Sequence, residues 1–245
     1  MSGPVVPFFF PKDNTGIGFH AAADPWNPRW RGTAGKNVQR DREFDLIWRM
    51  GGRWLKFYAA GDTMGEAVQE ATRFGFVSIV RHQHKPPTLD VVPSDQIEYY
   101  VDRGAIYQEC FLNEPELELG RPPLPEVIDA MTEMYRRFAD ACYTTGAIPI
   151  TPAIQGDRFE KWFKPFIDRM IAKGWKDALE GSVIGGHWRP GAMPPDSPPI
   201  DAAQGGVGFV FRSYEYWHDY LISKGLGNQP MFGTEAGYEP TDLRP

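Results

Sequence analysis

Short apolar runs of β-type alternate with longer amphipathic stretches along this 245-residue chain. The short runs predict strands, and the longer stretches carry apolar residues at the three-to-four-residue spacing of a helix. Repeated alternation of this kind is typical of an α/β fold with a parallel sheet. The seven predicted strands are residues 16–22, 53–59, 76–82, 105–113, 147–154, 182–188 and 229–236.

Glycines separate several of the amphipathic stretches from the strands that follow them. A glycine just past the last helical residue is the expected end of a helix. The predicted helices are residues 41–50, 64–74, 94–101, 125–144, 159–179 and 213–223, and the punctuating glycines are Gly51, Gly75, Gly104, Gly146 and Gly181.

The loop after the first predicted strand separates two candidate folds. A doubly wound open sheet would have a glycine-rich phosphate loop there, but the sequence from His20 is His-Ala-Ala-Ala-Asp-Pro-Trp. We therefore expect a (β/α)8 TIM-barrel-like domain over residues 1–245 with seven recognisable βα units. The chain ends ten residues after Glu235, so the eighth strand is missing, is supplied by residues 5–10, or lies in sequence beyond Pro245. We favour the last option and expect a C-terminally incomplete barrel.

Composition excludes several classes of partner. Hydrophobic residues make up 42% and charged residues 24% of the chain, as in an ordinary folded domain. The formal net charge is −6, and lysines and arginines are dispersed, which argues against nucleic-acid and anionic-membrane partners. The apolar residues 5–10 are too short to span a membrane and lack the flanks of a signal peptide. We expect a soluble chain with no visible signal peptide, and no disulfide between Cys110 and Cys142.

Polar residues gather at the carboxyl ends of the predicted strands, which form one rim in a barrel. They include His20, Asp62, Asn113, Glu114, Gln155, His187, Glu235 and Tyr238. Residues 111–116 (Phe-Leu-Asn-Glu-Pro-Glu) end the fourth predicted strand, and residues 232–238 (Phe-Gly-Thr-Glu-Ala-Gly-Tyr) end the seventh. These motifs resemble clan A of the glycoside hydrolases, in which an Asn-Glu pair closes strand four and a Glu closes strand seven. The resemblance implies Glu114 as acid/base and Glu235 as nucleophile.

The function implied is retaining hydrolysis of a β-linked oligo- or polysaccharide. Retention requires two carboxyl groups about 5–5.5 Å apart across the glycosidic bond. Burial and the neighbouring carboxylate would raise the pKa of Glu114 so that it can protonate the leaving oxygen, while Glu235 stays ionised. We expect a carbohydrate partner and no cofactor.

The same resemblance suggests the residues that bind the sugar. Asn113 would form a hydrogen bond with the 2-hydroxyl group of the sugar, and Arg81 or His82 would line the sugar subsite beyond strand three. His187 corresponds to the clan's strand-six histidine, but Arg189 replaces a tyrosine found in several members, and Lys56 stands where many have an arginine. The expected substrate-binding residues are Asn113, His187, Trp188, Tyr238, Arg81, His82 and His20.

Two alternatives remain open from the sequence. The unassigned eighth strand and the departures at Lys56 and Arg189 allow a non-catalytic carbohydrate-binding barrel. The pair His82 and His84 allows metal-dependent hydrolysis, although such sites usually begin on the first strand and need further ligands. With only five histidines, spread over several elements, we expect no catalytic metal.

Overall fold

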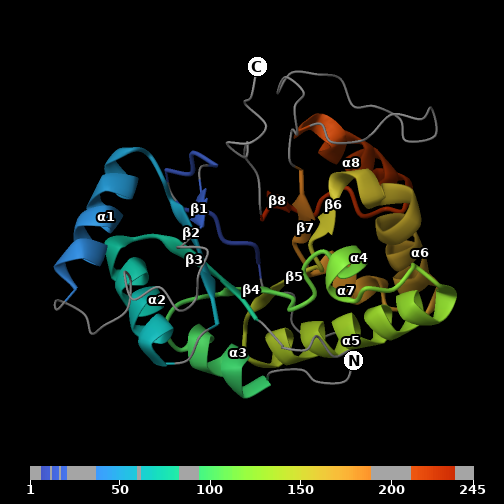
Figure 1. Ribbon diagram of the computed structural model, residues 1–245, viewed down its shortest axis with the longest axis horizontal. Helices are drawn as coiled ribbons and strands as arrows, with labels where there is room; N and C mark the ends of the chain where they lie inside the picture. Colours follow the sequence, from blue (N-terminus) through green and yellow to red (C-terminus); the bar gives the residue numbers. More distant parts are fainter. Residues whose placement is uncertain are drawn as a thin grey trace. The chain divides into compact units, whose positions relative to one another are not determined.

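The computed structural model describes residues 7–11, 13–16, 18–20, 37–59, 62–82, 94–188 and 211–234 (Figure 1). The chain divides into two compact units. Unit 1 contains Met1–Phe111 and Phe138–Pro149, and unit 2 contains Leu112–Arg137 and Ile150–Pro245. The chain therefore passes from unit 1 to unit 2 directly before the motif that contains Glu114.

Unit 1 is built on a sheet whose strands follow one another in chain order. The strands are β1 (Gly18–His20), β2 (Trp54–Tyr58), β3 (Val77–Arg81), β4 (Tyr107–Glu109) and β5 (Ile148–Ile150), which reaches the unit boundary. The first four pair in parallel, and Tyr58, Arg81 and Glu109 are register partners across β2, β3 and β4. Side chains alternate along a strand, so these three share one face of the sheet.

Three helices cover the opposite face of this sheet: α1 (Val38–Arg49), α2 (Asp62–Phe74) and α3 (Ser94–Val101) (Figure 1). Helix α1 is preceded by its N-cap residue Asn37, whose side chain accepts a hydrogen bond from the Arg40 backbone N–H at 2.9 Å. Phe44 from α1 and Val68 from α2 pack against Leu55 and Phe57 in one core cluster. Burial of both faces explains why β2 and β3 are buried along their full length.

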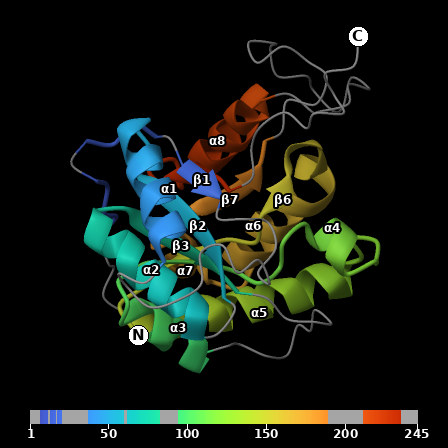
Figure 2. The same cartoon turned by 60° about the vertical axis from the view of Figure 1, so that its left-hand side comes forward.

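Unit 2 contains the parallel sheet β6 (Ile154–Gln155), β7 (Ile184–His187) and β8 (Met231–Gly233). Figure 2 labels β6 and β7 of this sheet. The first part of the long helix α5 (Pro125–Thr144) also belongs to this unit. Its other helices are α4 (Pro115–Glu118), α6 (Lys164–Ala172), α7 (Lys176–Glu180) and α8 (Tyr214–Ser223). A 3-10 turn at Gly156–Arg158 and a π-helix at Phe159–Phe163 connect β6 to α6.

The parallel α/β class expected from the sequence is confirmed, but two predicted elements are divided. The run 147–154 forms β5 and β6, and residues 151–153, which include Pro152, lie between the two strands. The predicted helix 159–179 is a π-helix, α6 and α7, with a break at Gly174, which has a φ of 75°. Among the described residues no strand follows β8, and residues 7–10 are not a strand. A single barrel domain over the whole chain stays a prediction.

A search of the described residues for a helix long and apolar enough to cross a lipid bilayer finds none. Cys110 and Cys142 are free thiols, both buried in unit 1.

Candidate functional site

Glu114 has the most unusual backbone conformation in the described part of the chain. Its φ of 48° and ψ of 62° are left-handed, and it is the one non-glycine residue described there with a positive φ. The next residue is Pro115, and a residue before proline normally prefers an extended conformation. Such strain persists only where surrounding contacts fix it, and it is concentrated at functional sites.

Backbone hydrogen bonds on both sides hold Glu114 in place. Its N–H donates to the Ala153 carbonyl at 2.7 Å, and its own carbonyl accepts from the amides of Leu117 and Glu118 at 2.7 and 2.9 Å. Proline at the first position of α4 favours helix initiation at this point. The strand end and the helix start therefore fix the position from which the Glu114 side chain leaves the backbone.

The Glu114 carboxyl group meets an imidazole and an amide inside unit 2. His187 Nδ1 lies 2.8 Å from Glu114 Oε1, and Gln155 Nε2 donates to the same oxygen at 3.0 Å. The residue Glu114 is 9% exposed, and the His187 side chain is fully buried. With the carboxyl group ionised, Nδ1 of His187 is the protonated nitrogen of the ring. This arrangement orients a buried carboxylate next to a group that can exchange a proton.

Two glycines allow β7 to place His187. A Cβ atom on Gly185 would lie 2.9 Å from the Thr151 carbonyl oxygen, and one on Gly186 would lie 2.5 Å from the Trp188 ring. Gly185 N–H donates to Thr151 Oγ1 at 2.9 Å. Gly185 thus permits a close approach of β7 to Thr151, and Gly186 leaves room for the Trp188 ring.

A second carboxyl group, Glu116, is attached to the same network. Its Oε1 accepts a hydrogen bond from the Gln155 backbone N–H at 3.1 Å. Burial raises the pKa of Glu116 to about 7, with a further upward contribution from Glu114 and a downward one from Arg158. Burial also raises the pKa of Asp157, with Glu114 again contributing. Sequence reasoning named Gln155 as a rim residue but gave no role to Glu116, although it lies within the quoted motif.

Asn113 and Trp188 flank Glu114 and His187 in sequence, and both are buried. Asn113 forms a parallel bridge with Ala153, and its backbone N–H donates to Glu118 Oε2 at 3.0 Å. Trp188 is 5% exposed and makes an edge-on contact with Trp217 of α8, with ring centroids 5.4 Å apart. The substrate-binding roles expected for Asn113 and Trp188 stay predictions.

Unit 1 brings two of the other predicted residues together at the carboxyl ends of its strands. The rings of His20 and Tyr58 have centroids 5.0 Å apart, and the Arg81 guanidinium carbon lies 5.3 Å from the Tyr58 ring centroid. Arg81 is 5% exposed. His20 and Arg81 therefore gather around one aromatic ring, as residues of a common rim would.

His82 turns to the opposite, helix-covered face of the unit 1 sheet. Its Nδ1 lies 3.0 Å from Gln96 Oε1 of α3, and its Nε2 lies 2.7 Å from Gln108 Oε1 of β4. Alternation along the chain places neighbouring residues on opposite faces, so Arg81 and His82 cannot both face the side of Tyr58. Of these two, Arg81 is the residue on that side.

Lys56 and Glu109 form a buried ion pair that the sequence did not indicate. Lys56 Nζ lies 2.8 Å from Glu109 Oε2 and 3.1 Å from Oε1, with side-chain exposures of 5% and 0%. The pair joins β2 to β4 on the face that also carries Tyr58 and Arg81. The alternation of β4, with Tyr107 and Glu109 on one face, was the available signal for an inward carboxylate.

Several predicted site residues lie outside the described residues: Glu235, Tyr238, His84 and Arg189. The proposed separation between Glu114 and Glu235 is thus an open prediction. Within the ranges that are described, no three His, Cys, Asp or Glu side chains are grouped as ligands of a metal ion would be.

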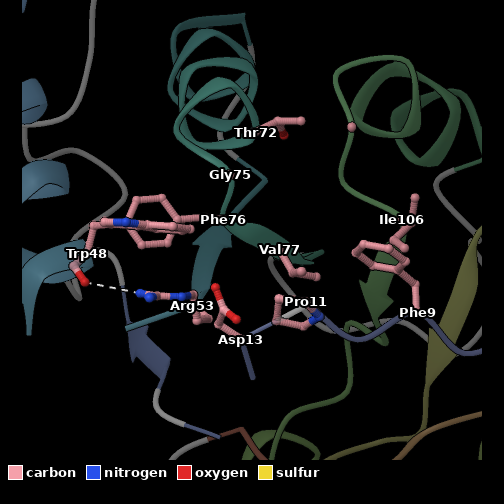
Figure 3. Close-up of a pocket in the computed structure, with 11 residues that line it drawn as sticks. Phe9, Pro11, Asp13, Trp48, Arg53, Thr72, Gly75, Phe76, Val77 and Ile106 are labelled. Carbon is pink, nitrogen blue, oxygen red and sulfur yellow. Dashed lines mark hydrogen bonds between the residues drawn. The ribbon is translucent and has the colours of Figure 1, made fainter. Parts of the chain in front are cut away.

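A cavity of 520 Å³ lies in unit 1 at the amino-terminal ends of β2, β3 and β4 (Figure 3). Its wall includes Phe9, Trp48 and Phe76, together with Arg53, whose Nη1 donates to the Trp48 carbonyl at 3.0 Å. Active sites of parallel α/β barrels lie at the other, carboxyl-terminal ends of the strands. We therefore place the candidate site at Glu114 and not in this cavity.

Comparisons with known proteins identify a fold but no family. No protein-family model matches the chain, and no curated protein matches it in sequence. The structure is similar to D-psicose 3-epimerase from Clostridium cellulolyticum H10 with D-tagatose, at a TM-score of 0.50 and 11% identity, over 90% of this chain and 84% of that chain. An L-ribulose 3-epimerase structure matches at a TM-score of 0.44 and 10% identity, over 91% and 82% of the two chains. The first similarity supports the TIM-barrel-like α/β fold predicted from the sequence.

The glycoside hydrolase assignment is wrong. The solved structure with a TM-score of 0.50 to this one is a sugar epimerase, not a clan A glycosidase, which overturns both the family resemblance and the expected retaining hydrolysis. The physical reason is that any parallel barrel directs carboxylates from its strand ends to one rim, whatever its chemistry. Asn113-Glu114-Pro115 and a strand count could not distinguish one such barrel from another.

Proposed function

We propose that this chain binds a sugar and catalyses its epimerisation or isomerisation, with Glu114 moving a proton at a carbon next to the carbonyl group. One observation carries the proposal: a buried, conformationally strained glutamate at a strand end shares one carboxyl oxygen with an imidazole and an amide. The D-psicose 3-epimerase to which the fold is similar acts on a sugar, which supports a carbohydrate substrate.

The reaction begins with one group that takes a proton from carbon. A carboxylate removes the proton from the carbon beside the carbonyl, and the electron pair of the broken C–H bond forms an enediolate. The same carboxylate can return the proton on its own face to the former carbonyl carbon, which, with transfer of the hydroxyl proton, exchanges aldose and ketose. Inversion of the first carbon instead needs a proton from a second acid on the opposite face. Neither outcome gains or loses atoms, so no co-reactant is consumed.

The neighbours of Glu114 suit this role. The hydrogen bonds from His187 and Gln155 fix the carboxyl group, and a positioned base needs such orientation to reach a substrate proton. The His187 Nδ1–H also hydrogen-bonds the ionised carboxylate, which is the form of Glu114 that accepts a proton. The Glu114 position thus combines orientation, burial and a proton-bearing neighbour.

The proposal is tested by following hydrogen exchange on a sugar. The protein is incubated in D2O with D-tagatose, D-psicose and other ketoses, and proton NMR measures deuterium appearing at the carbons beside the carbonyl. We expect exchange with at least one sugar and a loss of about 10²–10⁴-fold in Glu114→Gln, the usual contribution of a general base.

Glu126→Gln is the matched control, because Glu126 is an exposed residue in the first turn of α5. It should exchange at the wild-type rate. The proposal is abandoned if wild-type protein labels none of the ketoses, or if Glu114→Gln labels them as fast as wild type. Sugar binding without labelling would indicate a carbohydrate-binding barrel instead.

A further inference from the structure

Glu116 and Glu114 are joined through a single residue of β6. Glu116 Oε1 accepts from the backbone N–H of Gln155, and the Gln155 side chain donates to Glu114 Oε1. Gln155 therefore contacts both carboxyl groups: its backbone N–H donates to Glu116 and its side-chain amide donates to Glu114. A shift of Gln155 away from Glu116 would also move its side chain relative to Glu114.

The two oxygens of Glu116 have different surroundings. Oε1 is engaged by Gln155, whereas Oε2 is buried and has no hydrogen-bond partner among the described residues. A buried carboxylate oxygen without a donor is costly, and a protonated carboxyl group reduces that cost because it carries no charge. The geometry thus favours the neutral form of Glu116.

The charges that face Glu116 act in the same cluster. Burial is the largest cause of its pKa of about 7; hydrogen bonds from the backbone of Glu116 and Gln155 lower the pKa, the charge of Glu114 raises it and that of Arg158 lowers it. Asp157 belongs to the same group, since its carboxyl group also responds to Glu114, Arg158 and Lys161. Two carboxyl groups that share one site resist being ionised together, so a charged Glu114 disfavours the ionisation of Glu116.

We propose that Glu116 is a positioning residue that sets the charge of the Glu114 site: its carboxyl group holds Gln155 in place, and its neutral form leaves Glu114 as the ionised partner of His187. Ionisation of Glu116 adds a second negative charge to the cluster. That charge opposes the build-up of negative charge on an enediolate, so the neutral form supports turnover. The consequence for turnover rests on the function proposed above, but the titration itself does not.

The titration is measured first, without any substrate. Protein labelled with 13C at the glutamate carboxyl carbons is followed by NMR from pH 4 to 9, and the Glu116 signal is assigned by its loss in Glu116→Gln. We expect this carbon to titrate near pH 7. A midpoint at the ordinary value near 4.5 would overturn the proposal, and this measurement needs only wild-type protein to fold.

The effect on the site is read at the side-chain amide of Gln155 in 15N-labelled protein, because this amide donates to Glu114 and has no proton of its own to titrate. In wild type its chemical shifts should show an inflection near pH 7 that comes from Glu116. Glu116→Gln keeps an acceptor for Gln155 but cannot ionise, so the inflection should be lost. Asp157→Asn removes a neighbouring carboxylate that does not bind Gln155, and should retain it. An inflection that persists in Glu116→Gln refutes the role given to Glu116.

The rate of deuterium exchange then separates the two proposals. Wild-type exchange should fall about tenfold per pH unit above pH 7, as expected when one proton controls activity, and Glu116→Gln should stay flat. If no ketose is labelled but the inflection at the Gln155 amide behaves as expected, the proposed function fails and the role of Glu116 stands. If labelling depends on Glu114 but Glu116→Gln keeps the wild-type pH profile, the role of Glu116 fails alone.

Discussion

Glu109 in unit 1 and Glu114 in unit 2 are buried glutamates close together in the chain, but their surroundings differ. Glu109 lies in the regular strand β4 and is neutralised by Lys56 Nζ at 2.8 Å. Glu114 lies in a left-handed turn and is held by an imidazole and an amide. A carboxylate locked to a lysine is suited to joining strands, whereas one held by a histidine and an amide can still accept a proton. We therefore infer that Glu109 stabilises the fold, whereas Glu114 takes part in the proposed reaction.

The largest effect should follow from breaking the ion pair in unit 1. Glu109→Gln leaves the Lys56 ammonium group buried without its counter-charge, and loss of one partner of a buried pair typically costs about 3–5 kcal/mol. We expect the free energy of unfolding, measured by urea denaturation, to fall by that amount.

The double variant Lys56→Met/Glu109→Leu is the control for this prediction. Hydrophobic replacement of a whole buried ion pair is often neutral or stabilising, so much of the lost stability should return. A loss below about 1 kcal/mol in Glu109→Gln would mean that the pair is not the structural element described here.

The sequence predicted the elements of unit 1 well, because the runs 53–59 and 76–82 are short apolar segments between helical patterns and glycines. It predicted β5 and β6 as one strand because apolar character continues through Pro152, although a proline cannot donate a strand hydrogen bond. The local pattern of apolar residues indicates that a segment is a strand. Where that strand is interrupted depends on hydrogen bonds to the neighbouring strands, which the local pattern does not contain.

The candidate site was only partly predictable. Glu114 and His187 were named because both end predicted strands, and the structure brings them within 2.8 Å of each other. Glu116 and Glu109 were missed because their roles depend on tertiary partners, Gln155 and Lys56, that are distant in sequence. The reaction was assigned wrongly because residue type and strand position are common to many barrel enzymes.

An effect of intermediate size should appear in the pH dependence of stability. Glu116 has a folded pKa of about 7 against an ordinary value of 4.5. Between these values the folded protein keeps a proton that the unfolded chain has released, so the free energy of unfolding falls as pH rises from about 4.5 to about 7. Glu116→Gln removes this penalty.

Thermal and urea unfolding of Glu116→Gln and wild type should therefore diverge with pH. Allowing for its partial exposure, we expect the variant to be more stable by about 1–2 kcal/mol at pH 8 and no different at pH 4. Glu126→Gln, at an exposed position, should show no such divergence. If the free energies of unfolding of Glu116→Gln and wild type differ by a constant amount from pH 4 to pH 8, Glu116 does not titrate near neutral pH.

The smallest stability change should come from Glu114→Gln, the variant with the largest expected effect on proton exchange. The amide keeps a carbonyl oxygen that can accept from His187 Nδ1–H and Gln155 Nε2, and no lysine is left unpaired by the change. We expect the free energy of unfolding to change by less than about 1 kcal/mol, the size of an altered neutral hydrogen bond. Urea denaturation of Glu114→Gln and Glu109→Gln under the same conditions compares the two losses in free energy of unfolding directly. A loss as large as that of Glu109→Gln would show that Glu114 supports the fold in the same way, and the contrast between the two glutamates would fail.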